Sequence, residues 1–181
     1  MPTSPMLDKG PCEIVWGYNE SDAAYLGKTL GDVKVTMETE ASDINEDQAG
    51  NAPVNAILLG SVVSVEVPLT RLSVAQLRRV LNTTEPAGGP CIVPLENQVG
   101  CDLYPLAKQM VIKPVCAGVV STNPCEWIHL YHTYPIAGLD LTFNKDTQRI
   151  FPVTFKVFVS QESAWLGKFG TIGMDSAATT M

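Results

Sequence analysis

Two histidines are the first residues to consider as catalytic or metal-binding groups. His129 and His132 stand three positions apart in a stretch where side chains alternate as in a β-strand. Successive side chains of a strand point to opposite faces, so this odd spacing predicts that the two imidazoles lie on opposite faces. We therefore expect two ordinary side chains in an aromatic-rich strand, rather than a shared metal site or a base beside a nucleophile.

Five cysteines form the second such group: Cys12, Cys91, Cys101, Cys116 and Cys125. None belongs to a CxxC pair, and their spacings match neither a zinc finger nor a zinc ribbon. Cys116 and Cys125 stand beside Val or Pro rather than beside a base, so a nucleophilic pair with His129 has no local support. We expect free thiols, with a disulfide between Cys91 and Cys101 as the open alternative.

Acidic residues form the only dense charge cluster. Five carboxylates, with no basic residue among them, fall within ten positions: Glu38, Glu40, Asp43, Glu46 and Asp47. Asp43, Asn45 and Asp47 imitate the start of an EF-hand calcium loop. The sixth position is Gln48 where that loop needs Gly, and the twelfth is Val54 where it needs Glu. We expect either a solvated loop or an acidic surface shared between copies of the chain, and no bound metal or cofactor.

Other signatures of catalysis or nucleic-acid binding are absent from the sequence. It contains no GxSxG, GxxxxGK[ST], GxGxxG or HExxH motif. The net charge is −7 and the 12 basic residues are dispersed, whereas nucleic-acid affinity comes mainly from clustered Lys and Arg. We expect neither an enzyme nor a protein that reads DNA sequence.

Alternation of apolar and polar residues predicts most of the elements that must position these groups. Six stretches read as strands: residues 13–18, 32–38, 57–69, 107–115, 127–134 and 149–160. The clearest alternation places Val33, Val35 and Met37 on one face of a half-buried strand. Gly60 marks a bulge or a close backbone approach in another strand.

One helix is predicted over residues 70–83, where apolar residues recur at helical spacing and Ser73 or Thr70 serves as the N-cap. Six to seven strands with one packed α-helix predict a mainly β fold, either a β-sandwich or an open barrel. No apolar run approaches the length of a membrane span, and the N-terminus lacks the features of a signal peptide.

The predicted organisation is one domain over residues 12–160 with an extension at each end. Residues 1–11 are Pro-rich and read as an extended arm, and residues 161–181 form a tail with large apolar residues that we expect to dock on another surface. We expect both extensions to become ordered only between subunits. Residues 39–55 read as a long hydrophilic loop, which is unusual in a compact domain unless it contacts a partner.

Three stretches carry a resemblance to a known family. They are AYLGKTLGDVKV at residues 24–35, DQAGNAPVNAILLG at residues 47–60 followed by VSVEVPL at residues 63–69, and RIFPVTFKV at residues 149–157. Together they resemble the major tail tube proteins of long-tailed bacteriophages, in which an Asp-Gln-x-Gly-x-x-Pro-Val segment leads into a long strand and then a helix. Residues 84–125, rich in Cys and Pro, depart from that pattern.

The resemblance implies a hexameric ring, stacked many times, whose inner sheets complete a larger β-barrel around a channel. DNA would pass through this channel during ejection without specific binding, and the chain's partners would be further copies of itself and other tail proteins. The location implied is the tail of the virion, after synthesis in the host cytoplasm. Candidates to face the channel are Asp32, Glu38 and Glu66, because like charge keeps DNA from adhering. Candidates for contact with a neighbouring subunit are Glu40, Asp43, Glu46, Asp47, Gln48, Gly50 and Pro53.

Two alternatives stay open at this point. One is a stand-alone β-sandwich module that binds a ligand such as a carbohydrate, and the other is a protein that joins or caps a tail tube. An exposed cluster of aromatic side chains would favour the carbohydrate-binding module. However, Trp16, Trp127 and Trp165 are scattered along the sequence.

Overall fold

A computed structural model describes residues 10–18, 23–45, 52–81, 83, 92–95, 99–136 and 150–173. Within these ranges the chain is mainly β, as predicted, with one antiparallel sheet of ten strands, one α-helix and two short 3-10 helices. In chain order the elements are β1 (Cys12–Trp16), β2 (Ala24–Tyr25), β3 (Lys28–Thr29), β4 (Lys34–Asn45), β5 (Pro53–Thr70), α1 (Val74–Val80), η2 (Tyr104–Leu106), β6 (Lys108–Cys116), β7 (Val119–Val120), η3 (Pro124–Glu126), β8 (Ile128–Ile136), β9 (Phe151–Phe158) and β10 (Gly170–Ile172). The six predicted strands correspond to the longer ones, and the two-residue and three-residue strands are too short to give a periodic pattern.

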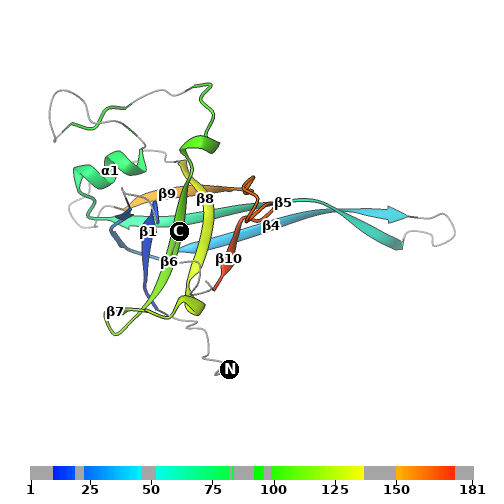
Figure 1. Cartoon of the computed structure of the whole chain (residues 1–181), viewed down its shortest axis with the longest axis horizontal. Coiled ribbons are helices and arrows are strands. Elements are labelled where there is room, and N and C mark those ends of the chain that lie inside the picture. Colours follow the sequence, from blue (N-terminus) through cyan, green and yellow to red (C-terminus); the bar gives the residue numbers. More distant parts are fainter. Residues whose placement is uncertain are drawn as a thin grey trace.

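The sheet curls toward an open barrel (Figure 1). Its order is β2-β1-β6-β8-β9-β5-β3, with β4 beside β5, β7 beside β6 and β10 beside β8. β2 pairs with β1 at one edge and β3 pairs with β5 at the other, yet only Leu26 and Gly27 separate β2 from β3. The segment 24–29 therefore bridges the two edges, although the sheet itself is not closed.

The core fills the inside of this curl with alternate side chains from five strands. The buried apolar cluster comprises Ile14, Trp16, Leu26, Val63, Val65, Val67, Leu69, Val80, Met110, Ile112, Leu130, Val153, Phe155 and Val157. The ring of Trp16 meets Phe155 edge-on at 6.0 Å between centroids, and its Nε1 donates a hydrogen bond of 3.1 Å to Oγ1 of Thr133. The period-two pattern of these five strands therefore places one face of each in the core, whereas β4 contributes no residue to the cluster.

Helix α1 covers one end of the barrel. Ser73 is the N-cap, as predicted, and forms a capping box with Gln76. Two other expectations are wrong, because Thr70 ends strand β5 and the helix stops at Val80 instead of reaching residue 83. Arg78 is buried and donates from Nε to the backbone oxygen of Ile92 at 2.8 Å.

The tail after β9 folds back onto the outer side of β8. β10 pairs with residues 128–130 of β8, and Trp165 stacks on Tyr131 with 4.5 Å between ring centroids. The described part of the tail thus docks on its own chain, where the sequence analysis expected ordering only between subunits. The N-terminal arm up to residue 9 and the tail from residue 174 lie outside the described residues.

Candidate assembly surface

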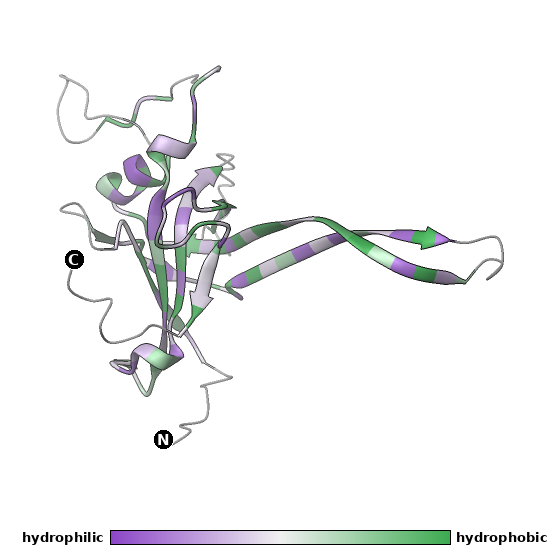
Figure 2. Ribbon diagram, turned by 45° about the vertical axis from the view of Figure 1, so that its right-hand side comes forward, coloured by the Kyte–Doolittle hydropathy of each residue, from purple (hydrophilic) through white to green (hydrophobic). Residues whose placement is uncertain are grey.

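A two-stranded arm projects from the barrel, on the opposite side from α1 (Figures 1 and 2). β4 and β5 pair from Lys34 opposite Glu66 out to Asn45 opposite Pro53. On the other edge of β5, β9 pairs only with Val63–Leu69. Beyond Val63 the ribbon has no third strand among the described residues. We call residues 37–45 and 53–62 the arm.

The arm corrects the prediction of a hydrophilic loop over residues 39–55. Residues 39–45 and 53–55 are paired strand. A ribbon exposed to water on both faces needs no alternation of apolar and polar residues. Without that alternation, its polar sequence was predicted to be a loop. Two of the expected contact residues, Glu40 and Asp43, lie in β4, and Pro53 begins β5. The others lie outside the described residues: Glu46, Asp47, Gln48 and Gly50.

The register assigns the arm two different faces near its root. Val35 and Met37 lie opposite Val65 and Val63, so their side chains continue the face of β5 that lines the core. Farther out a bulge leaves Leu59 without a direct partner, between Gly60 and Leu58. This bulge confirms the irregularity predicted at Gly60.

The apolar residues of the arm are exposed. Val63, the last residue paired with β9, is 4% exposed, whereas its neighbour Val62 is 58% exposed and Met37 is 62% exposed. At the bulge, Leu58 is 64% and Leu59 is 61% exposed. Green bands therefore run along the free part of the ribbon in Figure 2. Contiguous exposed apolar side chains of this size usually mark an interaction surface.

Charged side chains gather on the other face, which also carries Val62 opposite Glu38. Glu66 lies directly opposite Lys34, and Glu38 follows on the same face of β4. Lys156 of β9, which pairs with Ser64, adds a second cation near the root. Two of the three channel-facing candidates, Glu38 and Glu66, thus share one polar face of mixed charge. The third, Asp32, is exposed just before β4.

The two histidines lie on the outer face of β8, and their predicted separation to opposite faces is wrong. Between Leu130 and Thr133 the strand holds one residue more than β6 does, which is a β-bulge. Val111, opposite His129, lies outside the core cluster, and His132 pairs with Phe158, which also lies outside it. Both imidazoles therefore project outward, away from the core.

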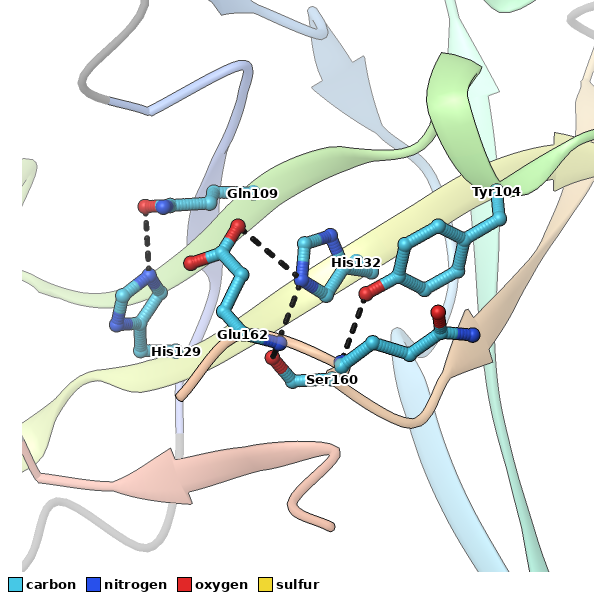
Figure 3. Close-up of polar contacts among 7 residues, drawn as sticks. Tyr104, Gln109, His129, His132, Ser160 and Glu162 are labelled. Carbon is cyan, nitrogen blue, oxygen red and sulfur yellow. Dashed lines mark hydrogen bonds and ion pairs between the residues drawn. The ribbon is translucent and has the colours of Figure 1, made fainter. Parts of the chain in front are cut away.

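His129 is held neutral inside a cluster of aromatic rings. Its ring contacts those of Tyr18, Tyr131 and Trp165, and its Nε2 lies 3.1 Å from Oε1 of Gln109 (Figure 3). An amide oxygen only accepts hydrogen bonds, so the neutral ring carries its hydrogen on Nε2. Burial lowers the pKa of His129 to about 4, because the charged form loses its hydration.

His132 has serine and carboxylate neighbours, but they are not arranged as a catalytic triad. Nε2 of His132 lies 3.3 Å from Oγ of Ser160 and 3.7 Å from Oε1 of Glu162 (Figure 3). In a triad the base meets the nucleophile with one ring nitrogen and the carboxylate with the other, whereas here both contacts involve Nε2. Ser160 is also buried at 1% exposed and accepts a hydrogen bond from the backbone nitrogen of Glu162. These contacts anchor the start of the tail, together with Tyr104, whose ring packs on His132.

The cysteines form no cluster in the described part of the chain. Cys101, Cys116 and Cys125 are exposed free thiols, and burial raises the pKa of the Cys12 thiol. The expectation of free thiols is therefore confirmed for Cys12, Cys101, Cys116 and Cys125, and because Cys101 is free, the alternative disulfide between Cys91 and Cys101 is not formed. Cys91 itself lies outside the described residues. Within the same ranges, no three His, Cys, Asp or Glu side chains are grouped so as to hold a metal ion.

No protein-family model matches the chain, and no curated protein matches it. In the described ranges, none of the helices has both the length and the apolar character needed to cross a membrane.

Proposed function

We propose that this chain is a structural subunit that self-assembles into the tail tube of a bacteriophage. The observation that supports the proposal best is the arm, a paired ribbon whose apolar side chains have no partner within the described chain. An isolated two-stranded ribbon is at best marginally stable in water. Its unpaired edges and exposed apolar groups also invite association. Contact with neighbouring copies removes both liabilities.

Closure of neighbouring sheets into a larger barrel is the arrangement implied by the sequence resemblance, and the polar face of β4 and β5 is suited to line its channel. Glu38 and Glu66 on this face repel phosphates, while Lys34 and Lys156 limit the net charge. Such a lining would let DNA slide through without retention. The neighbouring subunit would then cover the exposed apolar side chains on the opposite face of the arm, such as Met37 and Leu58.

Imaging of the purified full-length chain tests this function. We expect rings or hollow rods in negative stain, with large species in sedimentation velocity at high protein concentration. The double variant Leu58→Ser/Leu59→Ser should stay folded and assemble less. Leu166→Ser is the matched control, since Leu166 is equally exposed at 68% but lies on the tail. A wild-type chain that stays monomeric at every concentration would contradict the proposal.

One observation favours the second candidate, a carbohydrate-binding module. Trp127 and Trp165, far apart in sequence, belong to one series of ring contacts that also includes Tyr18, His129 and Tyr131. Sugar rings stack on exposed aromatic faces, but Tyr131 is 4% exposed and Nζ of Lys113 lies 4.3 Å from the Trp127 ring centroid. The faces are thus largely occupied by protein. A glycan array probed with wild type and Trp165→Ala tests this candidate, and binding lost in the variant would support it.

A further inference from the structure

We infer that residues 160–173 form a strap that closes over the outer side of β8 and lifts from it when His129 takes up a proton. We call these residues the strap. The barrel stays folded while the strap lifts, so the device is a local latch that opens in acid. Every contact that it uses lies within one subunit, and the inference therefore does not depend on the proposed self-assembly.

The strap is attached to the barrel by a short series of contacts. β10 pairs with only three residues of β8, 128–130. The backbone nitrogen of Tyr131 donates to the backbone oxygen of Phe169 at 3.0 Å, and Trp165 stacks on the Tyr131 ring. After Ser160, no residue of the strap is buried. A segment with so little buried surface opens at a lower free-energy cost than the core strands do.

His129 lies in the seam between the strap and the barrel. Thr171 of β10 pairs with His129, and the centroid of the Trp165 ring lies 6.4 Å from that of the imidazole. His129 is only 5% exposed, and part of that cover comes from the strap. Lifting the strap removes Trp165 from the imidazole and admits water to the seam.

The closed seam is suited to the neutral imidazole alone. Nε2 of His129 donates to Oε1 of Gln109, while Nδ1 has no hydrogen-bond partner in the part of the chain that the structure describes. Protonation adds a hydrogen on Nδ1, which then needs an acceptor. The other neighbours are the rings of Tyr18, Tyr131 and Trp165. A charge enclosed in this way loses its hydration, and no ion pair replaces it.

The charged and titratable groups around His129 do not offset this loss. They are Glu13 of β1 and Tyr18 just after it, Lys113 of β6, Tyr131 and His132 of β8, and Glu162 and Lys168 of the strap. Lys113 is itself a cation, and its Nζ lies 4.3 Å from the centroid of the Trp127 ring. Glu162 lies beside His132, with Oε1 3.7 Å from Nε2 (Figure 3). Burial is accordingly the one cause that lowers the pKa of His129 to about 4.

The direction of the coupling follows from the two states of the strap. With the strap closed the pKa of His129 is about 4, and with the strap lifted it returns toward the ordinary value of 6.5. The open state therefore binds the proton more readily. Closure has its full stability above pH 6.5 and loses it as the pH falls toward 4. Between pH 7 and pH 4.5 the population with a lifted strap should rise by about ten- to fiftyfold.

Native-state amide hydrogen exchange of the dilute full-length chain tests the latch, with rates expressed as protection factors at each pH. The probes are the amides of Tyr131 and Ser160, which donate to Phe169 and Lys168 of the strap. Between pH 7 and pH 4.5 their protection should fall by about ten- to fiftyfold, while the core amides of β5 stay protected. His129→Gln should abolish this fall. His132→Gln removes the other histidine and is the matched control, which should keep it.

The reciprocal effect gives a second test, because linkage acts in both directions. Trp165→Ala removes the ring that the strap places on His129, so the pKa of His129 should rise by at least about one unit. Leu166→Ala changes the next residue of the strap, which is 68% exposed, and should leave that pKa where it is. An NMR titration of the imidazole measures both shifts in the folded chain.

Each outcome decides for or against the latch. A loss of strap protection in wild type and in His132→Gln, but not in His129→Gln, supports it. No loss in wild type, or an equal loss in all three chains, overturns it, and so does a loss that vanishes only in His132→Gln. Core amides of β5 that lose protection together with the strap would show that the strap does not lift by itself. An unchanged pKa of His129 in Trp165→Ala also overturns the inference. None of these results bears on self-assembly, which imaging tests separately.

Discussion

Strand β5 runs through two regions of the molecule that differ sharply in burial. From Val63 to Leu69 it pairs with β9, and its core-facing residues are at most 4% exposed. From Ile57 to Val62 it is as apolar, yet its large side chains are 55–64% exposed. The two halves of β5 have a similar composition. They differ in burial because only the half from Val63 to Leu69 pairs with a third strand, β9.

This comparison teaches that the barrel is stabilised by its own chain and the arm is not. A buried apolar side chain contributes roughly 1.5–3 kcal/mol relative to an exposed one. The half of β5 in the barrel gains this burial free energy within the subunit. The half in the arm gains it only when another molecule covers the arm. Substitutions should therefore affect the unfolding of the subunit in the barrel, and assembly in the arm.

The largest contrast is expected between Phe155→Ala in the barrel and Leu58→Ala in the arm. Phe155 is 0% exposed and contacts Trp16, so its loss leaves a cavity that costs about 3–5 kcal/mol. Leu58→Ala should change the free energy of unfolding of the monomer by less than about 0.5 kcal/mol. Urea unfolding of dilute monomer measures both. A loss above about 2 kcal/mol for Leu58→Ala would show that the arm is packed within the subunit.

Acid should weaken the barrel through His129. The folded-state pKa of about 4 lies below the ordinary value of 6.5, so the unfolded chain binds the proton more readily. The stability that comes from keeping this ring neutral is fully present above pH 6.5 and is lost as the pH falls toward 4. Between pH 7 and 4.5, wild type should lose about 2 kcal/mol more than His129→Gln, which does not titrate. Urea unfolding of both chains across this range measures the difference, and parallel pH profiles would contradict the assignment.

Two threonines give a smaller contrast of the same kind. Oγ1 of Thr133, in the barrel, donates to the backbone oxygen of Lys108 at 2.8 Å and accepts from Trp16. Thr133→Val removes both side-chain hydrogen bonds, leaving Nε1 of Trp16 only its 3.3 Å bond to the backbone oxygen of residue 133, and should cost about 1.5 kcal/mol. In the arm, Oγ1 of Thr39 lies 3.2 Å from Oγ of Ser61, but both are exposed. Thr39→Val should change the free energy of unfolding by less than about 0.5 kcal/mol, measured in the same urea denaturation assay. Equal losses of stability in Thr39→Val and Thr133→Val would contradict the distinction between arm and barrel.

The barrel could be predicted from the sequence because apolar and polar residues alternate along its strands. One face of β5 and of β9 lies in the core, and burial on one face imposes period two on the residues. The alternation over residues 32–38 also predicted a strand correctly, but its expected half-burial is wrong, because Val35 and Met37 are 38% and 62% exposed. The N-cap at Ser73 was also predictable, since its capping box with Gln76 is local in sequence.

The arm and the outer face could not be predicted in the same way. Without a buried face, residues 39–45 show no alternation, so paired strand looked like loop. His129 and His132 were assigned to opposite faces on the assumption of regular alternation, but one extra residue near Tyr131 reverses it. Unlike the bulge beside Gly60, this bulge has no glycine to mark it in the sequence. The contacts of Trp165 and Ser160 with β8 depend on the tail folding back, which local patterns do not encode.

The smallest expected difference in stability is between alanine substitutions at two glycines, one packed on the barrel and one in the arm. At Gly170 of β10 a Cβ atom would clash with the backbone oxygen of His129, while at Gly60 of the arm it would meet nothing within 4 Å. Gly170→Ala must push β10 away from β8, but the cost should be only about 1 kcal/mol, because a three-residue strand can detach locally without unfolding the barrel. Gly60→Ala should be neutral in unfolding. Amide hydrogen exchange distinguishes the mechanisms: Gly170→Ala should raise exchange at Tyr131, whose nitrogen donates to Phe169, and leave the core amides of β5 protected. Uniformly faster exchange would mean instead that docking of the tail is part of the same cooperative unit as the barrel, and that only the arm stands apart.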